Sequence, residues 1–355
     1  MNKIIAEVKV ASCQQYEKQE VEKSMTNIIK DLFQKSKFEK GDRILIKPNI
    51  LRKASLQSGT TTHPVILECV IEALLGSGLE VTIADSPGGS KSNTLTEFLE
   101  ICEATGIVDI TKKYPSVKLA FINAGIREGK FIIYRNLRDY DKILNIAKLK
   151  THILTYFSGA VKNIFGLVPG KHKLDYHAKF PQRRAFSKFI MELFDHITPT
   201  YNILDGIIGM EGDGPSKGSS KYAGVLLGSN NGFAVDEVAM GLTGLNSLKC
   251  LYMKDNLEIK LEGDLPSKTK FKEPITAMRG VNLCYYLENI ERFNNLPIPL
   301  IKENYCVGCG TCMKICPESA IQIIKNVPRI DYDKCIKCYC CYELSGCKAI
   351  ELRVK

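Results

Sequence analysis

Residues 306–317 read Cys306-Val-Gly-Cys309-Gly-Thr-Cys312-Met-Lys-Ile-Cys316-Pro317. Two residues separate the first cysteine from the second and the second from the third, and three residues separate the third from the fourth. A tight loop with this spacing can direct three thiolates toward one iron–sulfur cubane, which takes one thiolate per iron. A fourth cysteine that precedes proline is typical of a ligand to a neighbouring cluster. The run therefore predicts a second cysteine run elsewhere in the chain.

That second run reads Cys335-Ile-Lys-Cys338-Tyr-Cys340-Cys341, and Cys347 follows it. The two runs together resemble a bacterial two-cluster ferredoxin, which implies two 4Fe-4S clusters. In such a domain each run supplies three ligands to one cluster and one ligand to the other. We call the cluster expected on Cys306, Cys309 and Cys312 cluster I. The cluster expected on Cys316, Cys335, Cys338 and Cys341 is cluster II.

The fourth ligand of cluster I departs from the ferredoxin pattern. Ser345 stands where that pattern has cysteine, and Gly346 stands where it has proline. We expect Cys347 to be the ligand, because a thiolate suits an iron–sulfur cluster better than a serine oxygen does. Ser345 and Cys340 are the alternatives, and we interpret Cys340 as a spare thiol.

Zinc is the alternative occupant of such runs, because paired C-x2-C steps also form zinc knuckles. Three successive cysteines at this spacing, followed by Cys316-Pro317, favour iron–sulfur over zinc. Alternating apolar residues follow each run, at 320–323 and 349–352, and predict short strands of a pseudo-symmetric domain. We expect this small ferredoxin-like α+β domain over residues 305–355.

The composition argues against several classes of protein. The chain has 355 residues, of which 45% are hydrophobic, and no apolar run reaches the length of a membrane span. Its formal net charge is +10, but the lysines are dispersed and no nucleic-acid-binding motif is present. We therefore expect an acidic partner or an anionic substrate rather than nucleic acid. Glu7 and Lys9 interrupt what would be the apolar part of a signal peptide, so we expect a cytoplasmic protein.

The rest of the chain alternates strand-like and helix-like patterns. Apolar runs at 4–10, 43–46, 79–84, 142–146, 201–204 and 225–228 indicate strands, and helical spacing is found at 21–38, 65–75 and 183–196. This alternation predicts βαβ units, so we expect an α/β body with a largely parallel sheet over residues 1–291. Pro297 and Pro299 indicate a linker, expected over residues 292–304.

Six short motifs occur along the body. They read Ile46-Lys47-Pro48-Asn49, Thr61-Thr62-His63-Pro64, Asp85-Ser86-Pro87-Gly88, Lys148-Leu149-Lys150-Thr151-His152, Gly159-Ala160-Val161-Lys162-Asn163 and Met210-Glu211-Gly212-Asp213-Gly214-Pro215. In this order they resemble domain-of-unknown-function family 362, which is often fused to a two-cluster ferredoxin tail. The resemblance covers nearly the whole chain. It implies the domain architecture and the cluster content more than a particular reaction.

Several of these motifs directly follow predicted strands. In open α/β sheets, ligands bind beyond the carboxyl ends of the strands, so the motifs predict one rim that carries cations and carboxylates. We assign substrate binding there to Lys47, His63, Asp85 and Lys162, and catalysis to Lys150, His152, Glu211 and Asp213. Two alternatives stay open. His63 could serve only as a helix cap, and residues 209–218 could form a plain surface loop.

Three functions are compatible with these motifs. The first is a pure electron carrier, the second is an oxidoreductase whose body holds a substrate, and the third is a regulatory module with structural clusters. A carrier needs only the cluster domain, whereas some three hundred further residues carry a rim of polar motifs. We therefore expect a ferredoxin-linked oxidoreductase that acts on a small anionic substrate. A redox partner protein or a low-potential donor would supply its electrons.

Overall fold

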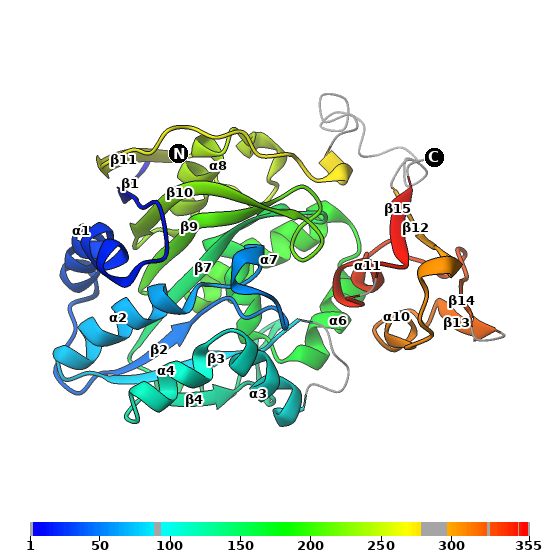
Figure 1. Ribbon diagram of the computed structural model, residues 1–355, viewed down its shortest axis with the longest axis horizontal. Helices are drawn as coiled ribbons and strands as arrows, with labels where there is room; N and C mark the ends of the chain where they lie inside the picture. The colour runs from blue at the N-terminus through cyan, green and yellow to red at the C-terminus, as the bar shows by residue number, and fades with distance from the viewer. Residues whose placement is uncertain (1–2, 89–93, 278–296, 325–326, 347, 354–355) are drawn as a thin grey trace.

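The protein consists of an α/β body and a small C-terminal domain that lies at one side of it (Figure 1). The computed structural model describes residues 3–88, 94–277, 297–324, 327–346 and 348–353. Within these ranges, no helix combines the length and the apolar character that a membrane crossing requires.

A nine-stranded sheet forms the centre of the body, in the order β11-β1-β10-β9-β7-β2-β3-β4, with β8 paired to β7. Strands β7, β2, β3 and β4 are parallel to one another, and β9 is parallel to β7. Strand β10 is antiparallel to both β9 and β1. The strands are β1 (Ile4–Ser12), β2 (Arg43–Lys47), β3 (Glu80–Asp85), β4 (Lys118–Phe121), β7 (Lys142–His152), β8 (Tyr156–Ser158), β9 (Tyr201–Glu211), β10 (Ser219–Ser229) and β11 (Leu257–Gly263). The expectation of a largely parallel α/β sheet is confirmed.

Helices cover both faces of this sheet and enclose two hydrophobic cores. One face carries α1 (Lys18–Ser36), α2 (Pro64–Gly76), α3 (Leu95–Ala104) and α4 (Ile107–Lys113). The other carries α5 (Ala160–Asn163), α6 (Gly170–Lys179), α7 (Arg183–Ile197) and α8 (Gly232–Leu242). A separate hairpin joins β5 (Gly125–Glu128) to β6 (Phe131–Tyr134). Because β2, β3, β7 and β9 run in one direction, their carboxyl ends form a single rim.

Strand β9 is longer than the sequence pattern indicates. The apolar run predicts a strand only to residue 204, yet β9 continues to Glu211 and forms a hairpin with β10. Its continuation is rich in glycine, which disfavours strands in isolation. Hydrogen bonds to β7 on one edge and β10 on the other compensate for this low strand propensity. Glycine is also required at 209, because a Cβ there would lie 2.9 Å from the Leu149 carbonyl oxygen. Asp205 therefore lies within β9.

The described residues of the C-terminal domain form two short antiparallel strand pairs and two short α-helices. Its elements are β12 (Ile298–Ile301), α10 (Thr311–Lys314), β13 (Ile321–Ile324), β14 (Val327–Ile330), α11 (Cys340–Leu344) and β15 (Ile350–Arg353). Strand β12 pairs with β15, and β13 pairs with β14. The strands expected after each cysteine run are thus present.

The expected linker overlaps this domain. Residues 292–296 lie outside the described ranges, while 298–301 form the strand that pairs with β15. The domain limits therefore stay predictions.

Candidate functional site

The cysteines expected to hold cluster II line one cavity of the C-terminal domain. Cys316, Cys335, Cys338 and Cys341 all contribute to its wall, together with apolar side chains such as Ile321. Two positive φ angles, 52° at Lys337 and 60° at Tyr339, turn the loop between the cysteines. Four cysteines drawn from both runs therefore surround one space, as the exchange of ligands between the runs requires.

A second cavity of the same domain is lined by the cysteines expected to hold cluster I, Cys306, Cys309 and Cys312. Gly308 and Gly310 lie between them with φ angles of 69° and 68°, which glycine adopts without strain. Cys347, the expected fourth ligand, lies outside the described residues. Cys309 is exposed, whereas the cysteines around the other cavity are buried or half-buried.

The donor set of both cavities fits an iron–sulfur cluster. Thiolates are the ligands of such clusters, and seven of the eight expected thiolates line the two cavities. Among the described residues, no group of three or more His, Cys, Asp or Glu side chains is placed to hold a metal ion.

Cys340 is not among the residues that line the two cavities. It is fully buried and packs with Cys338 and with Leu174 of α6, so it belongs to the contact between domain and body. A hydrogen bond with the Cys338 sulfur, followed by burial, raises the pKa of Cys340 well above its usual value. The interpretation of Cys340 as a spare thiol stays a prediction.

Helix α11 attaches the C-terminal domain to the rim of the sheet (Figure 1). The Tyr342 hydroxyl donates to Asp213 Oδ2 at 3.2 Å, and the Ser216 hydroxyl donates to the Glu343 carbonyl oxygen. The Lys217 ammonium lies 4.1 Å from the centre of the Tyr342 ring. Since Cys341 belongs to α11, the cavity expected to hold cluster II lies on the side of the domain that meets the body.

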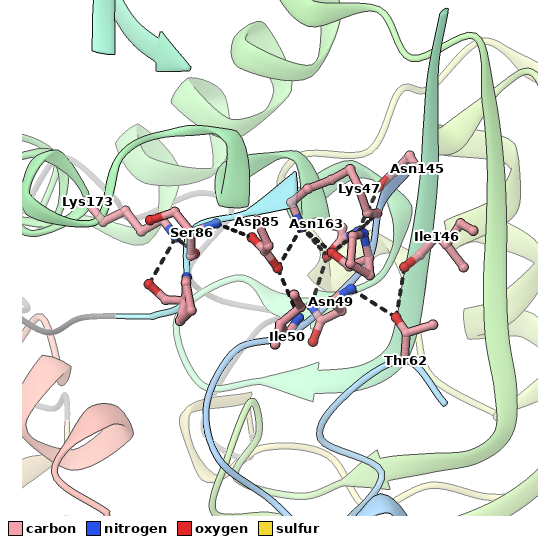
Figure 2. A network of polar contacts seen from close by, with 12 residues as sticks. Lys47, Asn49, Ile50, Thr62, Asp85, Ser86, Asn145, Ile146, Asn163 and Lys173 are labelled. Atoms are coloured by element: carbon pink, nitrogen blue, oxygen red, sulfur yellow. Dashed lines mark hydrogen bonds and ion pairs between the residues drawn. The ribbon is translucent and has the colours of Figure 1, made fainter. Parts of the chain in front are cut away.

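Lys47 and Asp85 form a buried ion pair at this rim, with 3.1 Å between Nζ and Oδ2 (Figure 2). Lys47 Nζ also donates to the Pro48 carbonyl oxygen and to Asn163 Oδ1. Asp85 accepts hydrogen bonds from the backbone N–H groups of Ile50 and Ser86. Burial lowers the pKa of Lys47, while Asp85 opposes that shift. Every donor of this ammonium is therefore used inside the protein.

A second buried ion pair joins two residues to which the sequence assigned no role. Lys148 Nζ lies 2.7 Å from Asp205 Oδ2 and donates to the Tyr16 hydroxyl, which in turn donates to Asp205 Oδ1. The Tyr16 ring stacks on His63 with 3.7 Å between ring centroids. His63 Nδ1 accepts from the Val65 N–H at 3.4 Å, which is the helix-capping contact. Lys148 follows the strand pattern at residues 142–146, but Tyr16 carries no signal in the sequence.

The two predicted acidic catalytic residues bind backbone groups of one neighbouring segment. Glu211 Oε2 accepts from the Lys272 N–H and Asp213 Oδ1 from the Ile275 N–H, both at 2.8 Å. Lys150, which is fully buried, donates to Asn49 Oδ1 and to the Thr60 carbonyl oxygen, both at 2.8 Å. Three of the four predicted catalytic residues thus have internal partners.

The fourth, His152, lies where body and C-terminal domain meet and has a free ring nitrogen. Its Nδ1 accepts from the N–H groups of Leu154 and Thr155, so the neutral ring carries its hydrogen on Nε2. This Nε2 lacks a hydrogen-bond partner among the described residues and lies 3.9 Å from Glu343 Oε1, which lacks one too. Burial lowers the pKa of His152 well below its usual value, and Lys162 is the next cause.

Lys162 completes this group of polar side chains. Burial lowers the pKa values of Lys150 and His152, and the nearby Lys162 ammonium lowers both further. Burial raises the pKa of Glu343 to about 8, and Lys162 opposes that shift. Nearby His177, from α6, also has an unpartnered buried Nδ1. Sequence reasoning missed Glu343 and His177, because neither lies in a motif of the body.

These observations define an α/β protein whose sheet rim is covered by a cysteine-rich domain suited to iron–sulfur clusters. A family profile described as "Domain of unknown function (DUF362)" matches residues 44–241, and one described as "4Fe-4S dicluster domain" matches residues 298–344. The chain belongs to the DUF362 family and carries a 4Fe-4S domain at its C-terminal end.

Individual relatives add detail. "Thylakoid-associated protein sll1697" from Synechocystis is 28% identical over 248 residues, which are 68% of this chain and 76% of that protein. A component of the ion-translocating oxidoreductase complex from Methanosarcina acetivorans is 44% identical over 48 residues, which are 14% of this chain and 18% of that protein. The lactate racemase apoprotein from Thermoanaerobacterium thermosaccharolyticum is a similar solved structure, with a TM-score of 0.42 and 13% identity over 69% of this chain and 58% of that chain. Such low similarity says nothing about the reaction.

Proposed function

We propose that the protein is a ferredoxin-linked oxidoreductase that passes electrons through two 4Fe-4S clusters to a small anionic substrate held by the α/β body. Cluster I would take Cys306, Cys309, Cys312 and Cys347, and cluster II would take the four cysteines around the other cavity. When bound, the clusters supply single-electron transfer. The body residues bind and orient the substrate.

One observation carries this proposal. The cavity lined by Cys316, Cys335, Cys338 and Cys341 lies on the side of the domain that α11 fixes to the carboxyl-end rim of the sheet. The other cavity has an exposed cysteine, Cys309, and the neighbouring Val307 is 79% exposed. Electrons would therefore enter at cluster I from a redox partner and reach the body through cluster II.

The test begins with anaerobically purified protein. We expect about eight irons per chain and reducible cubane signals by electron paramagnetic resonance. Acid extracts of the same protein, analysed by mass spectrometry, should release a small organic anion in stoichiometric amount. Zinc in place of iron, or clusters that a low-potential donor cannot reduce, would overturn the electron-transfer role. Redox-active clusters without any bound anion would favour a pure electron carrier.

A further inference from the structure

Three side chains near the contact between body and C-terminal domain have hydrogen-bonding groups without a partner among the described residues. His152 comes from the end of β7, Lys162 from α5 and Glu343 from α11. His152 and Glu343 are 0% and 5% exposed, so water does not reach them freely. A buried polar group without a partner destabilises the folded protein, because it has lost its hydrogen bonds to water. Two such groups that face each other across 3.9 Å indicate a missing partner between them.

The chemistry of the missing partner follows from the three groups. His152 Nε2 carries a hydrogen and donates, because Nδ1 already accepts two backbone N–H groups. Glu343 Oε1 needs a neighbour that can both donate and accept, whichever way the carboxyl group is protonated. A hydroxyl group meets both requirements, because it accepts from His152 and pairs with Glu343. The 3.9 Å separation leaves one oxygen within hydrogen-bond distance of both atoms.

Lys162 adds a charge requirement. Its ammonium has no hydrogen-bond partner among the described residues, and its contact with an aromatic ring is distant, 5.8 Å from the Phe165 centroid. The neighbouring Lys150 already donates to Asn49 and Thr60, and burial lowers its pKa well below the usual value, which disfavours a second positive charge there. Lys162 forms no ion pair within 4.0 Å among the described residues, so a group with one negative charge beside it balances its ammonium. The rim residues Lys47 and Lys148 do not need such an anionic group, because Asp85 and Asp205 already neutralise them.

We propose that His152, Lys162 and Glu343 bind a small α-hydroxycarboxylate, with its carboxylate on Lys162 and its hydroxyl between His152 and Glu343. This assignment rests on the proposed function and narrows its anionic substrate to one chemical class. It also places the binding site at the contact with α11, and not at Lys47 and Asp85, which form an ion pair with each other. The C-terminal domain then supplies both the neighbouring cluster and one wall of the binding site.

The experiment compares glycolate with acetate, which lacks only the hydroxyl group, by calorimetry on the anaerobic holoprotein. Glycolate should bind at least about tenfold more tightly, because a hydrogen bond to a charged group contributes about 1.5–3 kcal/mol. Lys162→Met should weaken both ligands by about tenfold or more. Glu343→Met should lower glycolate to the affinity of acetate. Lys171→Met removes an exposed lysine of α6 and should change neither affinity.

Iron content and paramagnetic resonance spectra verify that each variant keeps its clusters. If Glu343→Met lost them, the ratio of glycolate to acetate affinity in the unaltered protein would still decide the question. Equal affinities, or no binding of either probe, would overturn the assignment and leave an ordered water as the partner of His152 and Glu343. Reducible clusters alongside such a result would leave the proposed electron transfer standing, so the two failures are distinguishable.

Discussion

At the scale of single residues, the Lys47–Asp85 pair is expected to matter for stability. Lys47→Met leaves Asp85 as a buried carboxylate without its cation, and breaking a buried pair in this way costs about 3–5 kcal/mol. Urea unfolding of the anaerobic holoprotein measures this loss. Lys118→Met is the matched control, because Lys118 and Glu80 pair at the surface with 71% and 60% of their side chains exposed. It should cost no more than about 1 kcal/mol.

His63 should make stability depend on pH. Burial lowers the pKa of His63 to about 4, whereas an unfolded histidine has a pKa of about 6.5. Between these values the unfolded chain binds a proton that the folded protein does not, so this residue's contribution to stability falls as pH falls. From pH 7 to pH 5 the loss is about 2 kcal/mol. His63→Asn keeps a capping oxygen but cannot titrate, so its stability deficit should shrink by that amount at pH 5. A deficit that does not change with pH would contradict the assigned shift.

The fourth ligand of cluster I gives a sharper prediction. Cys347→Ala should convert cluster I to a labile three-iron form, because the remaining candidates are a serine oxygen and the buried thiol of Cys340. Ser345→Ala and Cys340→Ala should each keep about eight irons. Iron analysis and paramagnetic resonance of the three variants decide between them. Two intact four-iron clusters in Cys347→Ala, with a loss in either other variant, would show that the ligand is assigned wrongly.

At the scale of elements, α11 connects the two parts of the chain through Tyr342. Tyr342→Ala removes its hydrogen bond to Asp213 and its contact with Lys217, and truncation of a large buried aromatic side chain costs about 3 kcal/mol. Hydrogen exchange of α11 should therefore become faster, while the iron content stays the same. Tyr305→Ala is the control, since Tyr305 is 60% exposed. Equal acceleration in both variants would argue against α11 as the attachment.

At the scale of the whole molecule, the two expected clusters differ in their access to solvent. Cys309 is exposed, whereas Cys316, Cys338 and Cys341 are each 8% exposed and lie toward the body. Limited oxidation should therefore destroy cluster I first and leave about four irons. After iodoacetamide treatment, mass spectrometry should find Cys306 and Cys309 modified before Cys335 and Cys338. Simultaneous modification of all four would contradict this order.

The sequence alone determined the features that depend on local spacing. The cysteine runs have spacings of two and three residues, so one short loop positions several thiolates, and the 4Fe-4S domain followed from the sequence. The alternation of apolar runs with helical spacing predicted the α/β body, because this periodicity is also a property of short segments of the chain. Strand β9 is the exception, because its glycine-rich second half becomes a strand only when β7 and β10 pair with it.

The tertiary structure decided which polar side chains are free. Lys47, Lys150 and Lys162 look alike in the sequence, since each is a lysine in one of the six body motifs. Lys47 pairs with Asp85 and donates to Asn163. Lys150 donates to Asn49 and Thr60. Lys162 has neither kind of partner among the described residues and lies near Glu343 of the C-terminal domain. Glu343 follows Lys162 by 181 residues, and no local pattern links the two. Only the docking of α11 on the rim brings them together. Whether a polar side chain keeps an unused hydrogen-bonding group depends on which residues, distant in sequence, the fold places beside it.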